Sequence, residues 1–222
     1  MERFSRIHRH YDFFNHLFSL GTDIVWRREA AKEAILSKDR YKVLDIATGT
    51  GDLAIAVAQL SKEMGKTADI TGIDTNRDML SHVSPKVKRL GLSNIHAEQG
   101  NALKMRFDDA SFDVVTSAFA LRNFDNLETF SKELKRVMRR GGRFVLIDMA
   151  MPFKGARLMK VYFGAMRLVG STVNRKAYRF LTDSIMHFDR YKMVRLLKKA
   201  GFKRVRLRNL SGGIAFIISG TR

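Results

Sequence analysis

The sequence of 222 residues contains no cysteine. This absence excludes a disulfide framework, zinc–thiolate sites and cysteine nucleophiles, and it favours an intracellular compartment. Long apolar runs are also missing: none approaches the ~18 residues that span a bilayer, so the sequence does not predict an integral membrane protein. The opening MERFSRIHRHYDFFNHL has no apolar segment of the signal-peptide type. We therefore expect a cytoplasmic protein.

Acidic residues are scarce, above all near the C-terminus. The chain has 41 Lys and Arg against 22 Asp and Glu, a net charge of +19. Residues 151–222 hold 17 of these bases and only two acids. Such a field attracts polyanions, either nucleic acid or an anionic membrane surface. A basic solvated surface without a partner is the alternative, so charge alone does not name the partner.

What is present is an α/β pattern. Apolar residues make up 45% of the chain, and the length suits one domain. After residue 40, short apolar runs alternate with helical patterns, which predicts a doubly wound parallel sheet. The predicted strands are Lys42–Ala47, Ala68–Ile73, Asn94–Glu98, Phe112–Ala118, Arg143–Met149, Lys203–Leu207 and Ile214–Ser219. The helices between them are Leu53–Gly65, Arg77–Leu90 and Leu127–Met138.

The last two strands are too close in sequence for a crossover helix, so they predict an antiparallel hairpin. A seven-stranded, mostly parallel sheet that ends in such a hairpin is typical of Rossmann-like class I methyltransferases. We interpret residues 1–222 as a single domain with two additions. The first is an N-terminal helical cap, 1–38, with helices over Arg3–Phe18 and Asp23–Leu36 and Thr22 or Asp23 as an N-cap. The second is a helical lid insert at 150–188, before the last helix.

A glycine-rich loop follows the first strand in VLDIATGTGDLAIAVA, residues 43–58. Its G-x-G-x-x-A spacing (Gly49, Gly51, Ala54) suits a dinucleotide as well as other ligands. Asp45 and Asp52 flank the glycines, and two carboxylates favour a ligand with cationic groups over a pyrophosphate. S-adenosylmethionine carries an ammonium and a sulfonium. A P-loop is excluded, because no Lys-Ser/Thr follows the glycines.

Two further elements fit the same cofactor. Asp74 ends the second predicted strand, where a carboxylate can accept both ribose hydroxyls, and Met79 just beyond it can cover an adenine. Asn101 and Ala102 precede the fourth strand, where an amide can read an adenine edge. Each element alone is weakly diagnostic, but their order and spacing along the chain favour S-adenosylmethionine.

Several motifs resemble the menaquinone/ubiquinone biosynthesis C-methyltransferases nearly end to end. They are 11-YDFFNHLFSLGTDIVW-26, 45-DIATGTGDLA-54, 119-FALRNFDNL-127, 136-RVMRRGGRFVLIDMAMP-152, 178-YRFLTDSIMHF-188 and 209-NLSGGIAF-216. The resemblance implies S-adenosylmethionine-dependent C-methylation of a reduced demethylmenaquinone-type prenylated quinol, and a homodimer. A ubiquinone precursor is the alternative substrate. The sequence departs from the family pattern at Ala118, Ala120, Arg139-Arg140, Asp148 and Asp189.

The resemblance also implies a set of site residues. The cofactor set is Asp45, Thr48, Gly49, Thr50, Gly51, Asp74, Met79, Asn101, Ala102 and Ala118. The substrate set is Asn15, Asp148, Tyr178 and Arg179, and the catalytic set is Arg122, Tyr11 and Asn123. Asp148 stands where the family has Glu, a shorter side chain that puts a direct catalytic role there in doubt.

Arg122 is the leading catalytic candidate, because it follows the fourth strand at the carboxyl end of the sheet, where ligands bind. Its guanidinium can stabilise a phenolate. The alternatives are an ion pair with Asp12, Asp125 or Asp148 as scaffold for Arg122, a helix cap for Asn123 and a core position for Tyr11. No His or carboxylate grouping has metal-ligand spacing, so we predict no metal.

The segment 154-KGARLMKVYFGAMRLVG-170 predicts an amphipathic helix with one basic side. It is either an ordinary surface helix or a lid that receives an isoprenoid tail and meets anionic lipid at the inner face of the membrane. A nucleic-acid methyltransferase is a rival hypothesis, but the N/D-P-P-Y/F motif and a nucleophilic cysteine are both missing. A catalytically silent cofactor-binding protein is the third hypothesis.

Overall fold

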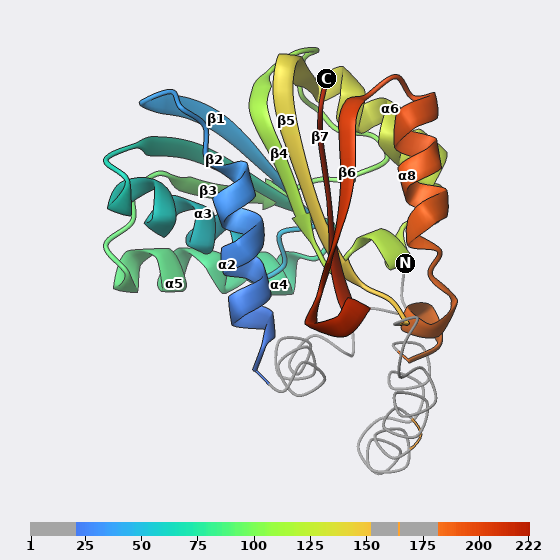
Figure 1. Cartoon of the computed structure of the whole chain (residues 1–222). Coiled ribbons are helices and arrows are strands. Elements are labelled where there is room, and N and C mark those ends of the chain that lie inside the picture. The colour runs from blue at the N-terminus through green and yellow to red at the C-terminus, as the bar shows by residue number, and fades with distance from the viewer. Residues whose placement is uncertain (1–20, 152–163, 165–181) are drawn as a thin grey trace.

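The computed structural model describes residues 21–151, 164 and 182–222 (Figure 1). The predicted helix over Arg3–Phe18, the amphipathic segment 154–170 and four candidate site residues lie outside this part of the chain. Those residues are Tyr11, Asn15, Tyr178 and Arg179.

Seven strands form one sheet in the order β3-β2-β1-β4-β5-β7-β6. They are β1 (Arg40–Ile46), β2 (Thr67–Asp74), β3 (Ile95–Gln99), β4 (Phe112–Ala118), β5 (Met138–Met149), β6 (Lys203–Leu210) and β7 (Ala215–Thr221). β1 to β5 pair in parallel, whereas β7 is antiparallel to both β5 and β6. The predicted sheet and its terminal hairpin are therefore confirmed.

Each face of the sheet carries its own apolar core, because successive strand residues point to opposite sides. In β1, Val43 belongs to one core and Leu44 to the other. The Val43 face is covered by α2 (Asp23–Ala34), α3 (Asp52–Glu63) and α5 (Val83–Arg89). The Leu44 face is covered by α6 (Leu127–Val137) and α8 (Arg190–Lys199). Figure 1 shows the sheet enclosed between these layers.

The prediction of one helix over Arg77–Leu90 was wrong. The segment divides at His82 into α4 (Arg77–Ser81) and α5. Pro85 is the cause: it has no N–H to donate to the carbonyl of Ser81, and its ring would clash with that carbonyl in a continuous helix. Asn76 starts α4 with its side chain, whose Oδ1 accepts from the N–H groups of Asp78 and Met79.

Smaller differences occur at element ends. Thr22 is the N-cap residue of α2, as predicted, but its side chain makes no capping bond. β5 begins five residues early, because Met138 already pairs with Phe112 before an irregularity in the register. A short 3-10 helix, η3 (Ser211–Gly213), closes the β6–β7 hairpin, and another, η2 (Leu121–Asn123), follows β4. None of the described helices has the length and apolarity to cross a bilayer.

Candidate active site

The loop between β1 and α3 is built for close approach of a ligand to its backbone. Gly49 and Gly51 adopt φ values of 57° and 86°, a region that side chains disfavour. A Cβ added to Gly49 would lie 3.2 Å from Cε of Met79. The loop is anchored by Thr48, whose N–H donates to the carbonyl of Ile73 across 2.9 Å. These features fit the predicted cofactor cradle.

Asp74 connects the second predicted element to that loop. It ends β2, and its Oδ2 accepts from the N–H of Gly49 at 2.9 Å. Its Oδ1 accepts from the N–H of Asn76 at 2.9 Å. The half-buried carboxylate thus lies beside the glycines at the carboxyl end of the sheet, where a ligand's ribose hydroxyls can reach it.

Asp45 and Asp52, the carboxylates that flank the glycines, both have protein partners in the structure. Asp45 is 1% exposed and accepts hydrogen bonds of 2.6 Å from the hydroxyls of Thr48 and Thr116. Burial raises the pKa of its carboxyl to about 6, although the two hydroxyls oppose this rise. Asp52 forms ion pairs with Lys86 at 2.8 Å and with Arg27 at 3.7 Å. Both carboxylates therefore already interact with protein groups, Asp45 through hydrogen bonds and Asp52 through ion pairs.

The other predicted cofactor residues surround the loop in different roles. The Thr50 hydroxyl accepts from Nζ of Lys86 at 2.7 Å. Asn101 is exposed, and its Oδ1 accepts from the N–H of Leu103 at 2.8 Å. Ala102 packs into the Leu44-side core, whereas Ala118 is half-buried at the end of β4. Asn101 is thus the member of this group with a solvent-facing amide.

Arg122 and Asp148 form a buried ion pair between η2 and β5. Nη1 of Arg122 contacts Oδ1 of Asp148, and the two side chains are 1% and 0% exposed. The Arg122 backbone N–H also donates to the Asp148 carboxylate, at 3.3 Å. Burial raises the pKa of the Asp148 carboxyl, and the charge of Arg122 opposes that rise. Asp148 is one of the three partners considered for Arg122, and another of them, Asp12, lies outside the described residues.

This pair leaves polar groups without partners. Nε and Nη2 of Arg122 and Oδ1 of Asn123 are buried and make no hydrogen bond with any of the residues that the structure describes. Buried polar atoms of this kind cost free energy unless something completes them. A ligand bearing both an oxyanion and a hydroxyl would supply what is missing, because the guanidinium donates and the amide oxygen accepts.

The sequence analysis missed Arg27. It is 8% exposed, contacts Asp23 on α2, and its guanidinium carbon lies 5.0 Å from the centre of the Phe119 ring. Phe119 follows β4, has a φ of 58°, and donates a hydrogen bond from its N–H to the carbonyl of Ile147. No local sequence pattern indicates that Arg27 is buried, because a base in the stretch WRRE is expected on the exposed side of a helix.

Across 21–151 and 182–222, no three His, Asp or Glu side chains are placed to hold an ion. His187 is exposed, with Nδ1 2.8 Å from the carbonyl of Asp183.

The glycine cradle after β1, the carboxylate that ends β2 and the antiparallel β7 together define a class I methyltransferase. Solved structures share the fold. A methyltransferase from Aquifex aeolicus matches with a TM-score of 0.63 and 21% identity over 87% of this chain and 88% of that one. Phosphoethanolamine N-methyltransferase 2 of Haemonchus contortus, solved in complex with S-adenosyl-L-methionine, matches with a TM-score of 0.65 and 14% identity. The match covers 89% of this chain and 52% of that one.

The family is narrower than the fold. The sequence profile of the ubiE/COQ5 methyltransferase family matches residues 1–222, so the chain belongs to this family. It is 39% identical to a demethylmenaquinone methyltransferase of Deinococcus radiodurans over 96% of this chain and 88% of the relative. The Thermus thermophilus enzyme of the same name is 37% identical over 99% of both chains. The predicted enzyme class and its cofactor, S-adenosylmethionine, are confirmed.

Proposed function

We propose that this methyltransferase transfers a methyl group to a ring carbon of a reduced, prenylated demethylmenaquinone-type quinol. The observation that carries the proposal is the buried Arg122–Asp148 pair, with two unpartnered guanidinium nitrogens beside the unpartnered amide oxygen of Asn123. Such a site suits a substrate that has two hydroxyls and loses one proton. The names of the relatives support the same substrate class.

S-adenosylmethionine, when bound, supplies the electrophilic methyl group. The chain must hold the quinol, exclude water and stabilise the phenolate whose formation makes the ring carbon nucleophilic. Arg122 donates to the phenolate oxygen through Nε and Nη2. Asn123 accepts a hydrogen bond from a substrate hydroxyl. Asp148 orients the guanidinium, which agrees with a supporting role for the shorter side chain that replaces the family Glu.

The cofactor-binding roles follow the loop geometry. Asp74 accepts from the ribose hydroxyls, Gly49 and Gly51 allow close backbone approach, and Asn101 reads the adenine edge. Asp45 acts from beneath the loop, through the hydroxyl of Thr48. Met79, Thr50, Ala102 and Ala118 shape the remaining wall. We assign the walls of the quinol site to Tyr11, Asn15, Tyr178 and Arg179, as the resemblance implies. The resemblance also implies a homodimer.

A peripheral contact with an anionic membrane would supply the prenylated substrate. Ile24 and Val25, in the first turn of α2, are each 61% exposed. One turn later, Arg27 pairs with Asp52 at the start of α3. The two exposed apolar side chains therefore lie at the side of the molecule that holds the carboxyl ends of the strands, near the substrate site. They favour an interfacial contact with anionic lipid, which the net charge of +19 strengthens.

One assay tests the substrate. Labelled methyl transfer is measured with three acceptors in parallel: reduced demethylmenaquinone, a reduced ubiquinone precursor and tRNA. We expect label in the demethylmenaquinone product. Label in the ubiquinone precursor alone would replace the ring assignment, and label in tRNA alone would overturn the proposal. Label in none of the three would favour a catalytically silent protein.

A further inference from the structure

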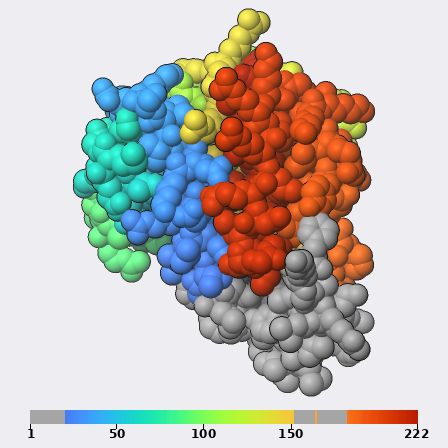
Figure 2. Space-filling model, in the orientation of Figure 1, coloured from blue at the N-terminus to red at the C-terminus, as the bar shows by residue number. Residues whose placement is uncertain are grey.

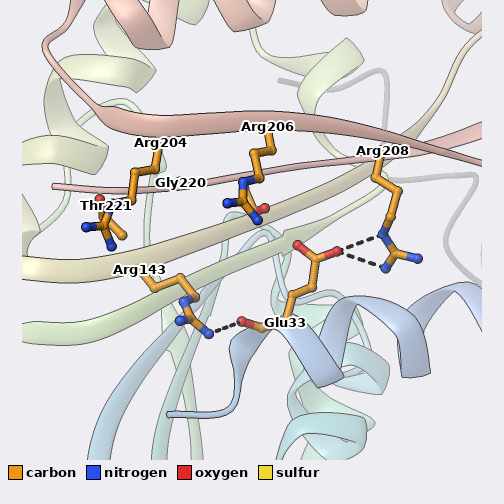
Figure 3. Close-up of a pocket in the computed structure, with 8 residues that line it drawn as sticks. Glu33, Arg143, Arg204, Arg206, Arg208, Gly220 and Thr221 are labelled. Atoms are coloured by element: carbon orange, nitrogen blue, oxygen red, sulfur yellow. Dashed lines mark hydrogen bonds and ion pairs between the residues drawn. The ribbon is translucent and has the colours of Figure 1, made fainter. Parts of the chain in front are cut away.

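A groove lined by arginine lies on the sheet, away from the active site. Its volume is about 480 Å³. Its lining consists of Glu33, Arg143, Arg204, Arg206, Arg208, Ser219, Gly220 and Thr221 (Figure 3). It lies along the seam between the α2 segment and the C-terminal hairpin, coloured blue and red in Figure 2. Arg143 stands at the start of the regular part of β5, so the groove reaches the end opposite the cofactor loop.

The alternation of β6 explains why the arginines gather there. Val205 and Leu207 pack against the Leu44-side core, so Arg206 and Arg208, which alternate with them, face the other side of the sheet. Arg206 of β6 pairs with Ser219 of β7. Arg204 lies within a register irregularity and has φ of 52°. A bulge of this kind redirects a side chain, and Figure 3 shows Arg204 beside Thr221.

Only part of this positive charge is neutralised within the described chain. Arg208 forms ion pairs with Glu29 at 3.0 Å and with Glu33 at 2.8 Å. Arg143 donates to the backbone carbonyl of Glu33 at 2.9 Å. Arg204 and Arg206 are exposed and have no ion pair or hydrogen bond with any described residue. Glu33 is thus already engaged by Arg208. The guanidinium of Arg143 points to the backbone carbonyl of Glu33, so Arg204 and Arg206 supply the remaining positive charge of the groove (Figure 3).

We propose that this groove binds the phosphate groups of a small polyphosphate anion, a di- or triphosphate. Guanidinium groups bind phosphate oxygens in pairs, and the hydroxyls of Ser219 and Thr221 add neutral donors. The volume lies within the range of small-ligand sites. The site is independent of the methyl-transfer reaction, because none of its lining residues belongs to the cofactor or quinol sets.

The lining also separates this ligand from other polyanions. It contains no aromatic side chain, whereas single-stranded nucleic acid binds by stacking its bases on aromatic rings. From Arg204 to Arg206 the strand spans only ~7 Å at about 3.3 Å per residue, which suits two or three phosphates. A bilayer surface is flat and does not enter a concave site. Recognition therefore rests on phosphate, not on a base.

The test uses the full chain and inorganic triphosphate, with binding measured by titration calorimetry in the absence of S-adenosylmethionine. We expect one saturable site. Arg204→Gln/Arg206→Gln should weaken it by about tenfold or more, as the loss of two charge-assisted contacts predicts. The matched control is Arg89→Gln/Arg106→Gln, which removes the same charge from exposed positions outside the groove. Thermal unfolding checks that all variants fold.

Three results would overturn the proposal. The first is no saturable binding, and the second is equal weakening in both double variants, which would indicate a general charge effect. The third is RNA or anionic-vesicle binding that depends on Arg204 and Arg206 while triphosphate binding does not. ATP serves as a further arm: we expect it to bind about as tightly as triphosphate, and much tighter binding would contradict recognition through phosphate alone.

Discussion

The carboxylate of Asp74 accepts a hydrogen bond from the backbone N–H of Gly49 across 2.9 Å. The end of β2 is thereby tied to the glycine loop that follows β1, and both lie at the carboxyl end of the sheet. This contact places an anionic acceptor next to the glycine loop at the point where a doubly wound fold binds its ligand.

The first prediction concerns Asp74. Asp74→Asn keeps the shape but removes the charge, so S-adenosylmethionine should bind roughly tenfold or more weakly, as the loss of hydrogen bonds to a charged group predicts. Titration calorimetry measures the affinity. Asp78→Asn is the matched control, because Asp78 is exposed on the neighbouring α4. Equal affinities for the two variants would remove Asp74 from the cofactor site.

A second prediction uses Gly49→Ala. The added Cβ meets both a positive φ of 57° and Cε of Met79 at 3.2 Å. Gly91→Ala introduces the same kind of strain, at φ of 61°, with nothing within 4 Å. Both variants should lose on the order of 1 kcal/mol of unfolding free energy. Only Gly49→Ala should also weaken cofactor binding, whereas a similar loss of affinity in both would refute the cradle.

Arg122→Ala should lower turnover by roughly 10²-fold or more, as removal of a charge-stabilising donor does. Its affinity for S-adenosylmethionine should change little, because Arg122 is assigned to the quinol. The single change leaves Asp148 buried without its cation, which costs about 3–5 kcal/mol. Arg122→Ala/Asp148→Asn removes both charges and should recover stability without recovering turnover. Turnover restored in the double variant would mean that Arg122 acts only as scaffold.

The pH dependence of stability follows from Asp45, whose pKa is about 6 in the folded protein against a model-peptide value of 3.8. Between these values the folded protein holds a proton that the unfolded chain has released, so the unfolding free energy falls as pH rises. The fall amounts to at most about 3 kcal/mol. Asp45→Asn should remove it and gain stability relative to the native protein at neutral pH. Urea unfolding from about pH 4 to 7 measures both proteins, and identical profiles would contradict the assignment.

Membrane contact is tested with Ile24→Ser/Val25→Ser. Both side chains are 61% exposed, and loss of their apolar surface should weaken binding to anionic vesicles by roughly tenfold. Met64→Ser/Leu90→Ser is the matched control, since these side chains are 55% and 42% exposed elsewhere. Vesicle sedimentation measures the bound fraction. If the two double variants bind alike, the first turn of α2 is not the contact.

Much of the fold could be predicted from local pattern. Alternation within the strands, as in Val43 and Leu44, sorts residues onto two faces, and the short link before β7 leaves no room for a crossover. The break at His82 was also readable, because Pro85 forbids a continuous helix there. The protein partners of Asp45 and Asp52 could not be predicted in this way. Their partners, Thr116, Lys86 and Arg27, come from other elements, and no local pattern shows them.

By itself, the sequence determined the sheet, the glycine loop and the family, because each depends on residue types at short, regular spacings. Only the tertiary structure decided which charges meet. Arg122 pairs with Asp148 because β4 and β5 are neighbours in the sheet. Two nitrogen atoms of the guanidinium lack a partner among the described residues because the pair is buried away from water. The register of β7 places Arg206 beside Ser219 and Arg143 beside Thr221, so both arginines line one groove. Such contacts join distant segments, so burial and register determine them.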